Sequence, residues 1–456
     1  MMRTFAKHLI LSLIVVMAFM SCSQDTLDAN TEQDNMLKQA VRASSPNGQL
    51  EHFILPNESD LDQIPQDKVL NPLTQAKVDL GKFLFFETGI ALDAFNPQGM
   101  GTYSCASCHI PSAGFRPGTF QGIADGGAGF GVNGEDRGIM SGYEEDDMDT
   151  QDARALSLLN VAYVENTFWN GQFGAGGVNI GTEDVWTHDN GSHVNELTVN
   201  GQHYQAIEAQ NIEGVETHRM LMNKKIADSL GFTTMFDASF PEFDIEERYS
   251  KLTLSLALSA YIRTLLSNQA PFQSWLKGNY SALSSAEKQG GMLFFGKANC
   301  STCHYNKNLG SKEFHALGVN DMYHRPSFSS SKEDFRNQGR GGFTGKEEDM
   351  FKFKVPQLYN MSDTPFYFHG SSIESLTDLV EYKNDAVKEN ENVPDGQMSE
   401  KFKSLNLTVE EKNNLVQFLE KSLYDPNLTR YQPENLMSGG CFPNADPQSM
   451  QDLGCR

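Results

Sequence analysis

The pentapeptide Cys-x-x-Cys-His occurs twice in this chain and constrains its fold more than any other feature. On a helical turn, positions i, i+3 and i+4 lie on one face, so two thiols and an imidazole can reach the same planar group. This spacing is the attachment signature of c-type haem, in which the thiols bond the porphyrin vinyl groups and the imidazole binds the iron. The sequence therefore predicts two covalently bound haem c groups, each with the motif histidine as proximal iron ligand. The predicted haem-binding residues are Cys105, Cys108, His109, Cys300, Cys303 and His304.

Two other interpretations of the paired cysteines are weaker. Two Cys-x-x-Cys pairs could hold a zinc ion, but a zinc site would not need a histidine directly after each pair. A thioredoxin-like redox pair would need a strand–helix–strand context, and none is visible around either motif. We therefore expect haem at both motifs.

The beginning of the chain predicts export. The basic residues Arg3, Lys7 and His8 precede an apolar stretch, residues 9–20, that is short for a membrane span. Residues 1–22 are therefore interpreted as a lipoprotein signal that ends at Cys22, the residue expected to carry the lipid. An ordinary cleaved signal with an incidental cysteine is the alternative. Residues 23–65 follow as a tether and extension, with a polar, structureless run at their start.

The remaining cysteines fit the same compartment. Of the seven cysteines, one is predicted to take lipid and four to take haem. Cys441 and Cys455 are left, and a disulfide between them suits an oxidising environment, with two free thiols as the alternative. We expect a protein of the cell envelope, facing the periplasm or the cell surface and held to the membrane by its lipid anchor alone.

The net charge bears on partners. A formal charge of -23 at pH 7 disfavours nucleic acid, which needs a basic surface. An acidic surface would instead help to recruit a basic electron-donor protein through long-range steering. Simple solubility is the alternative interpretation.

A weak internal repeat surrounds the two motifs. Residues 80–86 and 290–296 each have the character of the end of an amphipathic helix that precedes a haem-binding helix. Further helices are expected over about 204–226, 249–266, 281–293 and 408–423, with Ser284 and Glu287 forming a capping box. Strand signals are few, and residues 111–142 and 171–201 predict long loops. We therefore predict a mainly α fold with two cytochrome c-like haem domains in tandem, at residues 66–248 and 249–430, followed by a tail at 431–456.

At residues 66–430 the chain resembles the bacterial dihaem cytochrome c peroxidases, a family that also holds the dihaem enzyme that matures methylamine dehydrogenase. The resemblance rests on the order and spacing of several short strings around the two motifs. These are residues 80–86, Gly114-Phe115, residues 155–160, Phe168-Trp169-Asn170-Gly171, Ala270-Pro271-Phe272, residues 353–356 and Tyr367-Phe368-His369-Gly370.

The resemblance implies a division of labour between the haems. The first would react with hydrogen peroxide, and the second would take electrons from a small cytochrome c or cupredoxin. Trp169 would lie between them and help to carry electrons. The family uses a Glu after a Gln as its acid/base group, which matches Gln205 and Glu216, with Glu213 as the close rival and His218 as a further candidate.

The chain also departs from the family. No histidine occurs between His109 and His188, so the first haem is expected to be five-coordinate and ready to react without reductive activation. The family's interdomain calcium has an Asn ligand that matches Arg154 here, and a guanidinium would replace the charge of a cation rather than bind one. The distal ligand of the second haem stays open, because the family's ligand position falls at Lys383, next to Tyr382, and Met361, which lies before the motif, is an alternative.

The first hypothesis for function is an exported, lipid-anchored dihaem peroxidase that reduces hydrogen peroxide to water, with homodimers common in the family. A second is a dihaem oxidase that acts on a protein or organic substrate through a ferryl haem. A third is a pure electron-transfer cytochrome, which would have two six-coordinate haems inert to peroxide.

Overall fold

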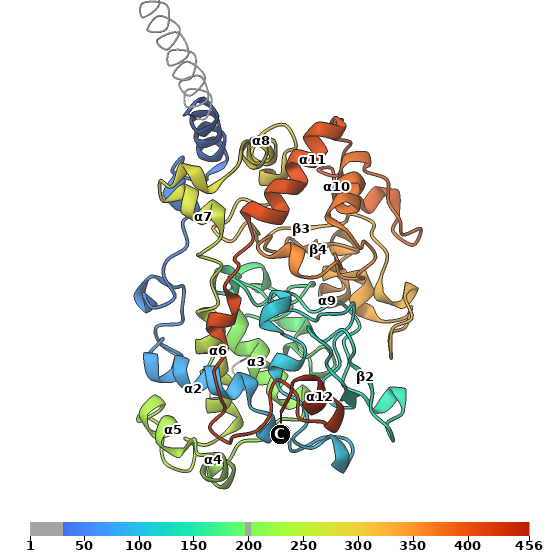
Figure 1. Ribbon diagram of the computed structural model, residues 1–456. Coiled ribbons are helices and arrows are strands. Elements are labelled where there is room, and N and C mark those ends of the chain that lie inside the picture. Colours follow the sequence, from blue (N-terminus) through green and yellow to red (C-terminus); the bar gives the residue numbers. More distant parts are fainter. Residues whose placement is uncertain (1–30, 197–201, 456) are drawn as a thin grey trace, which may run out of the picture.

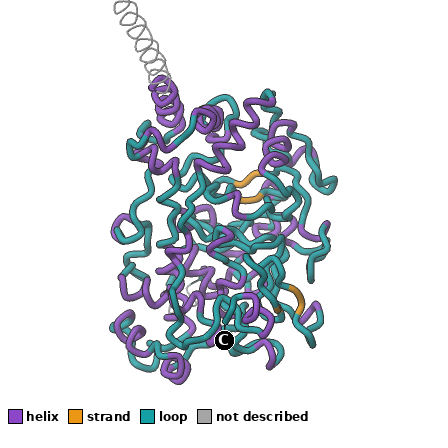
Figure 2. The backbone as a smooth tube through the Cα atoms, in the orientation of Figure 1, coloured by secondary structure: helices purple, strands orange, loops and turns teal. Residues whose placement is uncertain are grey.

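Helices, 3-10 turns and loops make up almost all of the fold, and sheet is minimal (Figures 1 and 2). The computed structural model describes residues 31–196 and 202–455. The helices are one over residues 31–44, α2 (Gln75–Phe86), α3 (Ala206–Thr217), α4 (Lys224–Leu230), α5 (Thr233–Ser239), α6 (Lys251–Arg263), α7 (Pro271–Leu276), α8 (Ser285–Phe294), α9 (Arg340–Thr344), α10 (Leu376–Asp385), α11 (Val409–Gln417) and α12 (Pro447–Asp452). Two antiparallel pairs of very short strands complete the described elements, β1 (Gly127–Ala128) with β2 (Gly138–Ile139) and β3 (Phe314–His315) with β4 (Phe353–Lys354). The prediction of a mainly α fold is confirmed.

Local sequence signals account for several helix boundaries. Ser284 accepts a hydrogen bond from the backbone N–H of Glu287, and the Glu287 side chain returns to Ser284, so the predicted capping box starts α8. A capping box at Ser250 likewise starts α6, within the segment that the sequence predicted as helical. The predicted helix over 408–423 is α11 followed by a π-helical turn, Phe418–Ser422.

Two helix pairs repeat the same close crossing. A Cβ atom on Gly81 of α2 would lie 1.9 Å from the carbonyl oxygen of Ala257 in α6, and one on Gly290 of α8 would lie 2.0 Å from that of Asn414 in α11. Only glycine permits backbones to approach so closely. Figure 1 shows one pair in each half of the molecule, which explains the sequence repeat between residues 80–86 and 290–296.

The repeat extends into the irregular segments. Asn160 and Asn360 both adopt left-handed backbone conformations, with φ of 58° and 56°. The backbone N–H of Asn160 donates to Leu265 O, and the backbone N–H of Asn360 donates to Leu423 O. Each asparagine therefore ties the loop after a haem motif to the end of the second helix of its pair.

Each half of the molecule has its own large hydrophobic cluster. One surrounds α2, α3 and α6, and the other surrounds α7, α8, α10 and α11. Leu37 and Val41 are completely buried in the second cluster, so residues 31–44 form a packed helix where the polar composition predicted a structureless tether. The division of the chain into domains at residues 248 and 249 stays a prediction.

The predicted helix over 204–226 is interrupted. α3 ends at Thr217, His218 is its C-cap residue, and α4 begins only at Lys224. Arg219 has a left-handed φ of 56°, and its guanidinium pairs with the fully buried carboxylate of Asp125. This tertiary ion pair breaks a helix that the periodicity alone would continue.

The C-terminal tail packs against the first half of the chain. Cys441 and Cys455 form a disulfide, and the Ser104 hydroxyl, directly before the first haem motif, donates to Pro443 O at 2.8 Å. Cys22 lies outside the described residues. Among residues 31–196 and 202–455, none of the helices combines the length and apolar character needed to cross a bilayer.

Candidate haem sites

Both motif histidines are held in the same way. Each motif forms a single tight turn, Cys105–Ser107 or Cys300–Thr302, rather than part of a longer helix. His109 Nδ1 lies 3.0 Å from Phe115 O, and His304 Nδ1 lies 2.7 Å from Leu309 O. When Nδ1–H donates to a backbone carbonyl, the neutral imidazole keeps the lone pair of Nε2 free, which is the tautomer that an iron ligand requires.

The electrostatics of both sites also suit a haem. Burial lowers the pKa of His109 and of His304 to about 4, so both imidazoles are neutral. Burial raises the pKa of Cys105 and of Cys108 to about 12. All four motif cysteines are unpaired thiols, so they are available for thioether bonds. The residues present therefore fit two covalently attached haem groups.

A histidine–carboxylate pair lies within electrostatic range of the first motif histidine. His218 Nδ1 lies 2.7 Å from Asp149 Oδ2. Burial alone would lower the pKa of His218, but the charge and hydrogen bond of Asp149 outweigh it and raise the pKa. His218 is close enough to His109 to lower the pKa of that proximal ligand. Sequence reasoning named His218 only as a further candidate and missed Asp149, because nothing local links positions so far apart in the chain.

The predicted acid/base residues lie at different places. Gln205 is the N-cap of α3, and its side-chain oxygen accepts from Arg263 at 3.2 Å. Glu216 lies near the other end of the helix, where its side chain is 68% exposed and pairs with Lys251. The helix separates them by roughly 16 Å at 1.5 Å per residue, so α3 does not bring them together. Glu213 is partly buried, 3.6 Å from His193, and burial raises the pKa of its carboxyl. The catalytic role of Gln205 and Glu216 stays a prediction.

Trp169 joins segments of the two halves. Its Nε1–H donates to Arg154 O at 2.7 Å, while its own carbonyl accepts from the Lys354 N–H at 2.8 Å. Its ring centroid lies 6.2 Å from that of His369, which is buried and pairs with Asp321 at 2.9 Å. The residue expected between the haems therefore contacts chain from both sides of the molecule.

The three candidate distal ligands of the second haem differ in their surroundings. The Tyr382 hydroxyl donates to Leu317 O at 2.6 Å, so it already has a partner. Met361 is 7% exposed and belongs to the second hydrophobic cluster. Lys383 is close enough to influence the pKa values of Cys300, Cys303 and His304.

The region that matches the family's calcium site is occupied by a guanidinium. Arg154 is 3% exposed, and its Nη2 donates to Pro117 O at 3.0 Å and to Thr364 Oγ1 at 2.8 Å. Its Nη1 donates to Thr119 O. Because Arg154 already satisfies these oxygens, the donor set does not fit a calcium ion.

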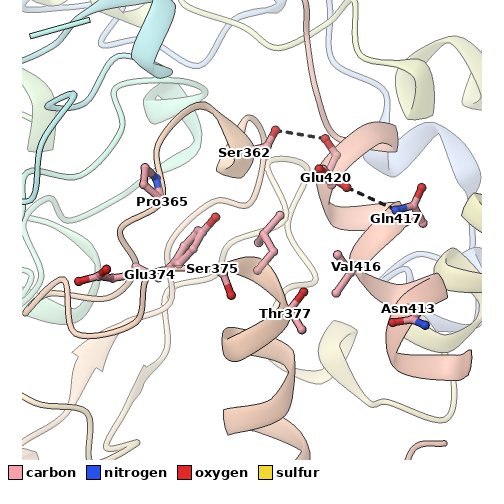
Figure 3. Close-up of a pocket in the computed structure, with 11 residues that line it drawn as sticks. Ser362, Pro365, Glu374, Ser375, Thr377, Asn413, Val416, Gln417 and Glu420 are labelled. Atoms are coloured by element: carbon pink, nitrogen blue, oxygen red, sulfur yellow. Dashed lines mark hydrogen bonds between the residues drawn. The ribbon is translucent and has the colours of Figure 1, made fainter. Parts of the chain in front are cut away.

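An open groove of about 680 Å³ lies between α10 and the segment that runs from α11 into the π-helical turn (Figure 3). Its lining includes Glu374, Thr377, Asn413 and Glu420, and it includes none of the six motif residues. The groove is therefore a separate feature from the haem sites.

Comparisons with known proteins agree with this geometry. Residues 75–281 match the family model described as di-haem cytochrome c peroxidase. The methylamine utilization protein MauG of Methylorubrum extorquens is 26% identical over 370 residues, covering 80% of this chain and 83% of that protein. The cytochrome-c peroxidase IdrP2 of Denitromonas iodatirespirans is 26% identical over 403 residues, covering 82% of this chain and 90% of that protein.

The fold has a solved counterpart. A crystal structure of a MauG-like protein associated with microbial copper homeostasis superposes with a TM-score of 0.55 at 24% identity, covering 82% of this chain and 95% of that chain. Two haem-attachment motifs in a mainly helical fold define a dihaem c-type cytochrome. More specifically, the chain belongs to the di-haem cytochrome c peroxidase and MauG family, whose members carry two haem c groups.

Proposed function

We propose that this protein reduces hydrogen peroxide to water at the first haem site, with electrons that enter at the second. The observation that carries the proposal is the hydrogen-bonded pair of His218 and Asp149, which lies within electrostatic reach of His109. Peroxide reduction consumes two electrons and two protons per molecule and yields two molecules of water. Such a reaction needs a proton-transfer group beside the iron.

The chain's own residues supply positioning and proton transfer. A bound haem would supply the iron that binds and reduces peroxide. His109, oriented by Phe115 O, would hold that iron from one side. The unpartnered Nε2 of His218 would take a proton from the inner peroxide oxygen and return it to the departing oxygen. Asp149 would hold His218 in the required tautomer and stabilise its protonated form.

We place electron entry at the second half. Leu309 O orients His304 as Phe115 O orients His109. Trp169 forms hydrogen bonds with the backbone of both halves, at Arg154 and at Lys354. The donor would be a small cytochrome c or a cupredoxin, attracted by the net charge of -23. We also keep the proposals of a lipid anchor at Cys22 in the cell envelope and of a homodimer.

The deciding experiment is the optical spectrum of the pure, oxidised holoprotein before and after equimolar hydrogen peroxide, followed by a donor assay. We expect a high-spin ferric signal that disappears on addition of peroxide, then peroxide-dependent oxidation of a reduced cytochrome c or cupredoxin. Peroxide reactivity without donor oxidation would favour an oxidase that acts on another substrate. Two low-spin haems that ignore peroxide, in the oxidised and the half-reduced protein alike, would favour an electron carrier.

A further inference from the structure

Lys383 occupies a position on α10 where an apolar residue is expected. Leu376 and Val380 are 7% and 2% exposed and pack into the second hydrophobic cluster. Residues three or seven positions further along a helix lie on the same face, which is the relation of Lys383 to Val380 and Leu376. The helix therefore places the half-buried Lys383 on the face of α10 that packs into this cluster.

This amine has no acceptor. Within residues 31–196 and 202–455, no carboxylate, carbonyl or hydroxyl oxygen forms a hydrogen bond or ion pair with Lys383 Nζ. An aromatic ring is near it, that of Phe402, whose centroid lies 5.4 Å away. Neighbouring lysines do find acids: Lys388 pairs with Asp395 and Lys401 with Glu313, each at 2.7 Å. Lys383 is half-buried, and an amine shielded from water without a hydrogen-bond acceptor is costly unless another group binds it.

The surroundings of Lys383 indicate which group that is. Cys300 of the motif packs against the same hydrophobic cluster that Leu376 and Val380 of α10 join, and Lys383 lies within electrostatic range of Cys300, Cys303 and His304. The thiols attach to the vinyl side of a c-type haem, whereas the propionates project from the opposite edge of the ring. A side chain within range of both sulfurs and the proximal imidazole is therefore nearer to the iron than to the propionates.

We propose that Lys383 Nζ is the sixth ligand of the second haem iron, on the face opposite His304. The proposal rests on haem attachment at the second motif and is independent of whether peroxide is the substrate. Coordination replaces the missing hydrogen-bond partner, since a neutral amine offers the iron one nitrogen lone pair. The two rivals are less suited, because the Tyr382 hydroxyl already donates to Leu317 O and Met361 contributes to the hydrophobic cluster.

An amine ligand would make the second haem low-spin. It would also lower the reduction potential relative to a methionine ligand, because thioether ligation raises the potential of a c-type haem. The second haem would then be a six-coordinate electron carrier, while the first haem stays open.

The test uses the holoprotein with Lys383→Met and Lys383→Arg, and with Lys388→Met as the matched control. Electron paramagnetic resonance and near-infrared magnetic circular dichroism of the oxidised protein report the axial ligands without any turnover. We expect Lys383→Met to replace the amine signature with the near-infrared band of thioether ligation and to raise the potential of the second haem. Lys383→Arg should lose the low-spin signature, because a guanidinium keeps the charge but does not bind iron. Lys388→Met should match the wild type.

Two results would overturn the proposal. If Lys383→Arg keeps the wild-type spectrum, Lys383 acts as a charge and not as a ligand. If Tyr382→Phe or Met361→Leu removes the low-spin signature while the Lys383 variants keep it, the ligand is one of those residues. Total haem content, measured as the pyridine haemochrome, shows whether each variant is still loaded. Because no readout uses peroxide, failure of this proposal and failure of the peroxidase proposal are separate outcomes.

Discussion

The two halves of this molecule share the helix pair and the histidine support around each haem motif, and they differ in the polar side chains near that motif. Each has a helix pair crossing at a glycine, Gly81 in one and Gly290 in the other, and each holds the motif imidazole through a backbone carbonyl. The His218–Asp149 pair lies within electrostatic range of His109, and Lys383 lies within electrostatic range of His304. The parts that repeat hold the haem, whereas the parts that do not repeat determine what each haem can do.

The differing residues lie where the halves lose their correspondence. His218 is at the C-terminus of α3, in the interrupted stretch before α4, and Lys383 is in the last turn of α10. The tail adds a further difference, because it packs against the first half, including the residue directly before the first motif, where the Ser104 hydroxyl donates to Pro443 O. Such additions can change without disturbing the helix crossings that support the imidazoles.

Loss of one haem should give the largest difference in function between the two halves. Replacing both motif cysteines by serine, at Cys105 and Cys108 or at Cys300 and Cys303, should leave one covalent haem per chain. We expect the first double variant to lose its reaction with peroxide, and the second to react once but lose turnover with the donor. Haem-stained gels and stopped-flow spectra make the measurement. The reverse assignment would contradict the proposed roles of the halves.

Removal of the His218 side chain should be the next largest effect. His218→Ala removes the proton-transfer group, and such groups contribute roughly 10²–10⁴-fold to the rate, so kcat/KM for peroxide should fall within that range. Glu216→Ala is the control on the same helix. It removes an exposed ion pair with Lys251, and exposed pairs contribute about 0–1 kcal/mol to stability, so turnover should hardly change. A large loss only in Glu216→Ala would return the role to the glutamate.

Asp149→Asn tests the same pair through pH. Asp149 raises the pKa of His218, Glu213 acts in the same direction, and burial and Arg219 oppose them. The neutral imidazole that accepts a proton is populated above this pKa, so the variant should move the acidic limb of kcat/KM to lower pH. The pair's contribution to stability is complete below the unfolded pKa of about 6.5 and is lost as pH rises through the raised folded pKa. A stability difference that persists at high pH would contradict this account.

Trp169→Phe should slow electron transfer between the halves without changing either haem site. We expect donor-dependent turnover to fall roughly tenfold, which corresponds to about 1.4 kcal/mol in the barrier, while the direct reaction with peroxide is unchanged. Trp186→Phe is the matched control, because its Nε1–H also donates a hydrogen bond, to Thr182 Oγ1 at 3.0 Å, within the first half alone. Equal effects of the two substitutions would argue against a specific role for Trp169.

Substitution of the glycine at each helix crossing should destabilise the two halves equally. Gly81→Ala and Gly290→Ala each force a methyl group against a carbonyl oxygen 1.9 or 2.0 Å away. Overpacking of this kind costs about 1–3 kcal/mol, so both should lower Tm by several degrees. Gly138→Ala and Gly396→Ala are controls, since a Cβ atom at either position meets nothing within 4 Å. A loss in one half only would mean that the repeat is not equivalent in its energetics.

Chelation should have the smallest effect. Because Arg154 already donates to the carbonyls of Pro117 and Thr119, EDTA should change neither Tm nor turnover. Arg154→Gln should destabilise the protein by about 1–3 kcal/mol for each buried carbonyl left without a donor, measured by thermal unfolding. A drop in Tm with EDTA, reversed by calcium, would show a metal site that the donor set does not indicate.

The sequence by itself determined the features whose atoms lie within a few residues of one another. The two Cys-x-x-Cys-His motifs, the capping box at Ser284 and Glu287, and the repeat around Gly81 and Gly290 were all predictable, because a helical turn brings such positions together whatever surrounds it. The mainly α fold follows from the same local periodicity.

Only the tertiary structure decided which distant residues share a pocket. Asp149 meets His218, 69 positions further along the chain, and α10 packs beside α11, which in turn packs on α8, the helix before the second motif. The break after α3 and the packing of residues 31–44 were likewise missed, because an ion pair with the buried Asp125 and a hydrophobic cluster bring in residues from other segments of the chain. Local bonding patterns are written in adjacent residues, whereas the chemistry of each haem pocket depends on where folded helices bring separate parts of the chain together.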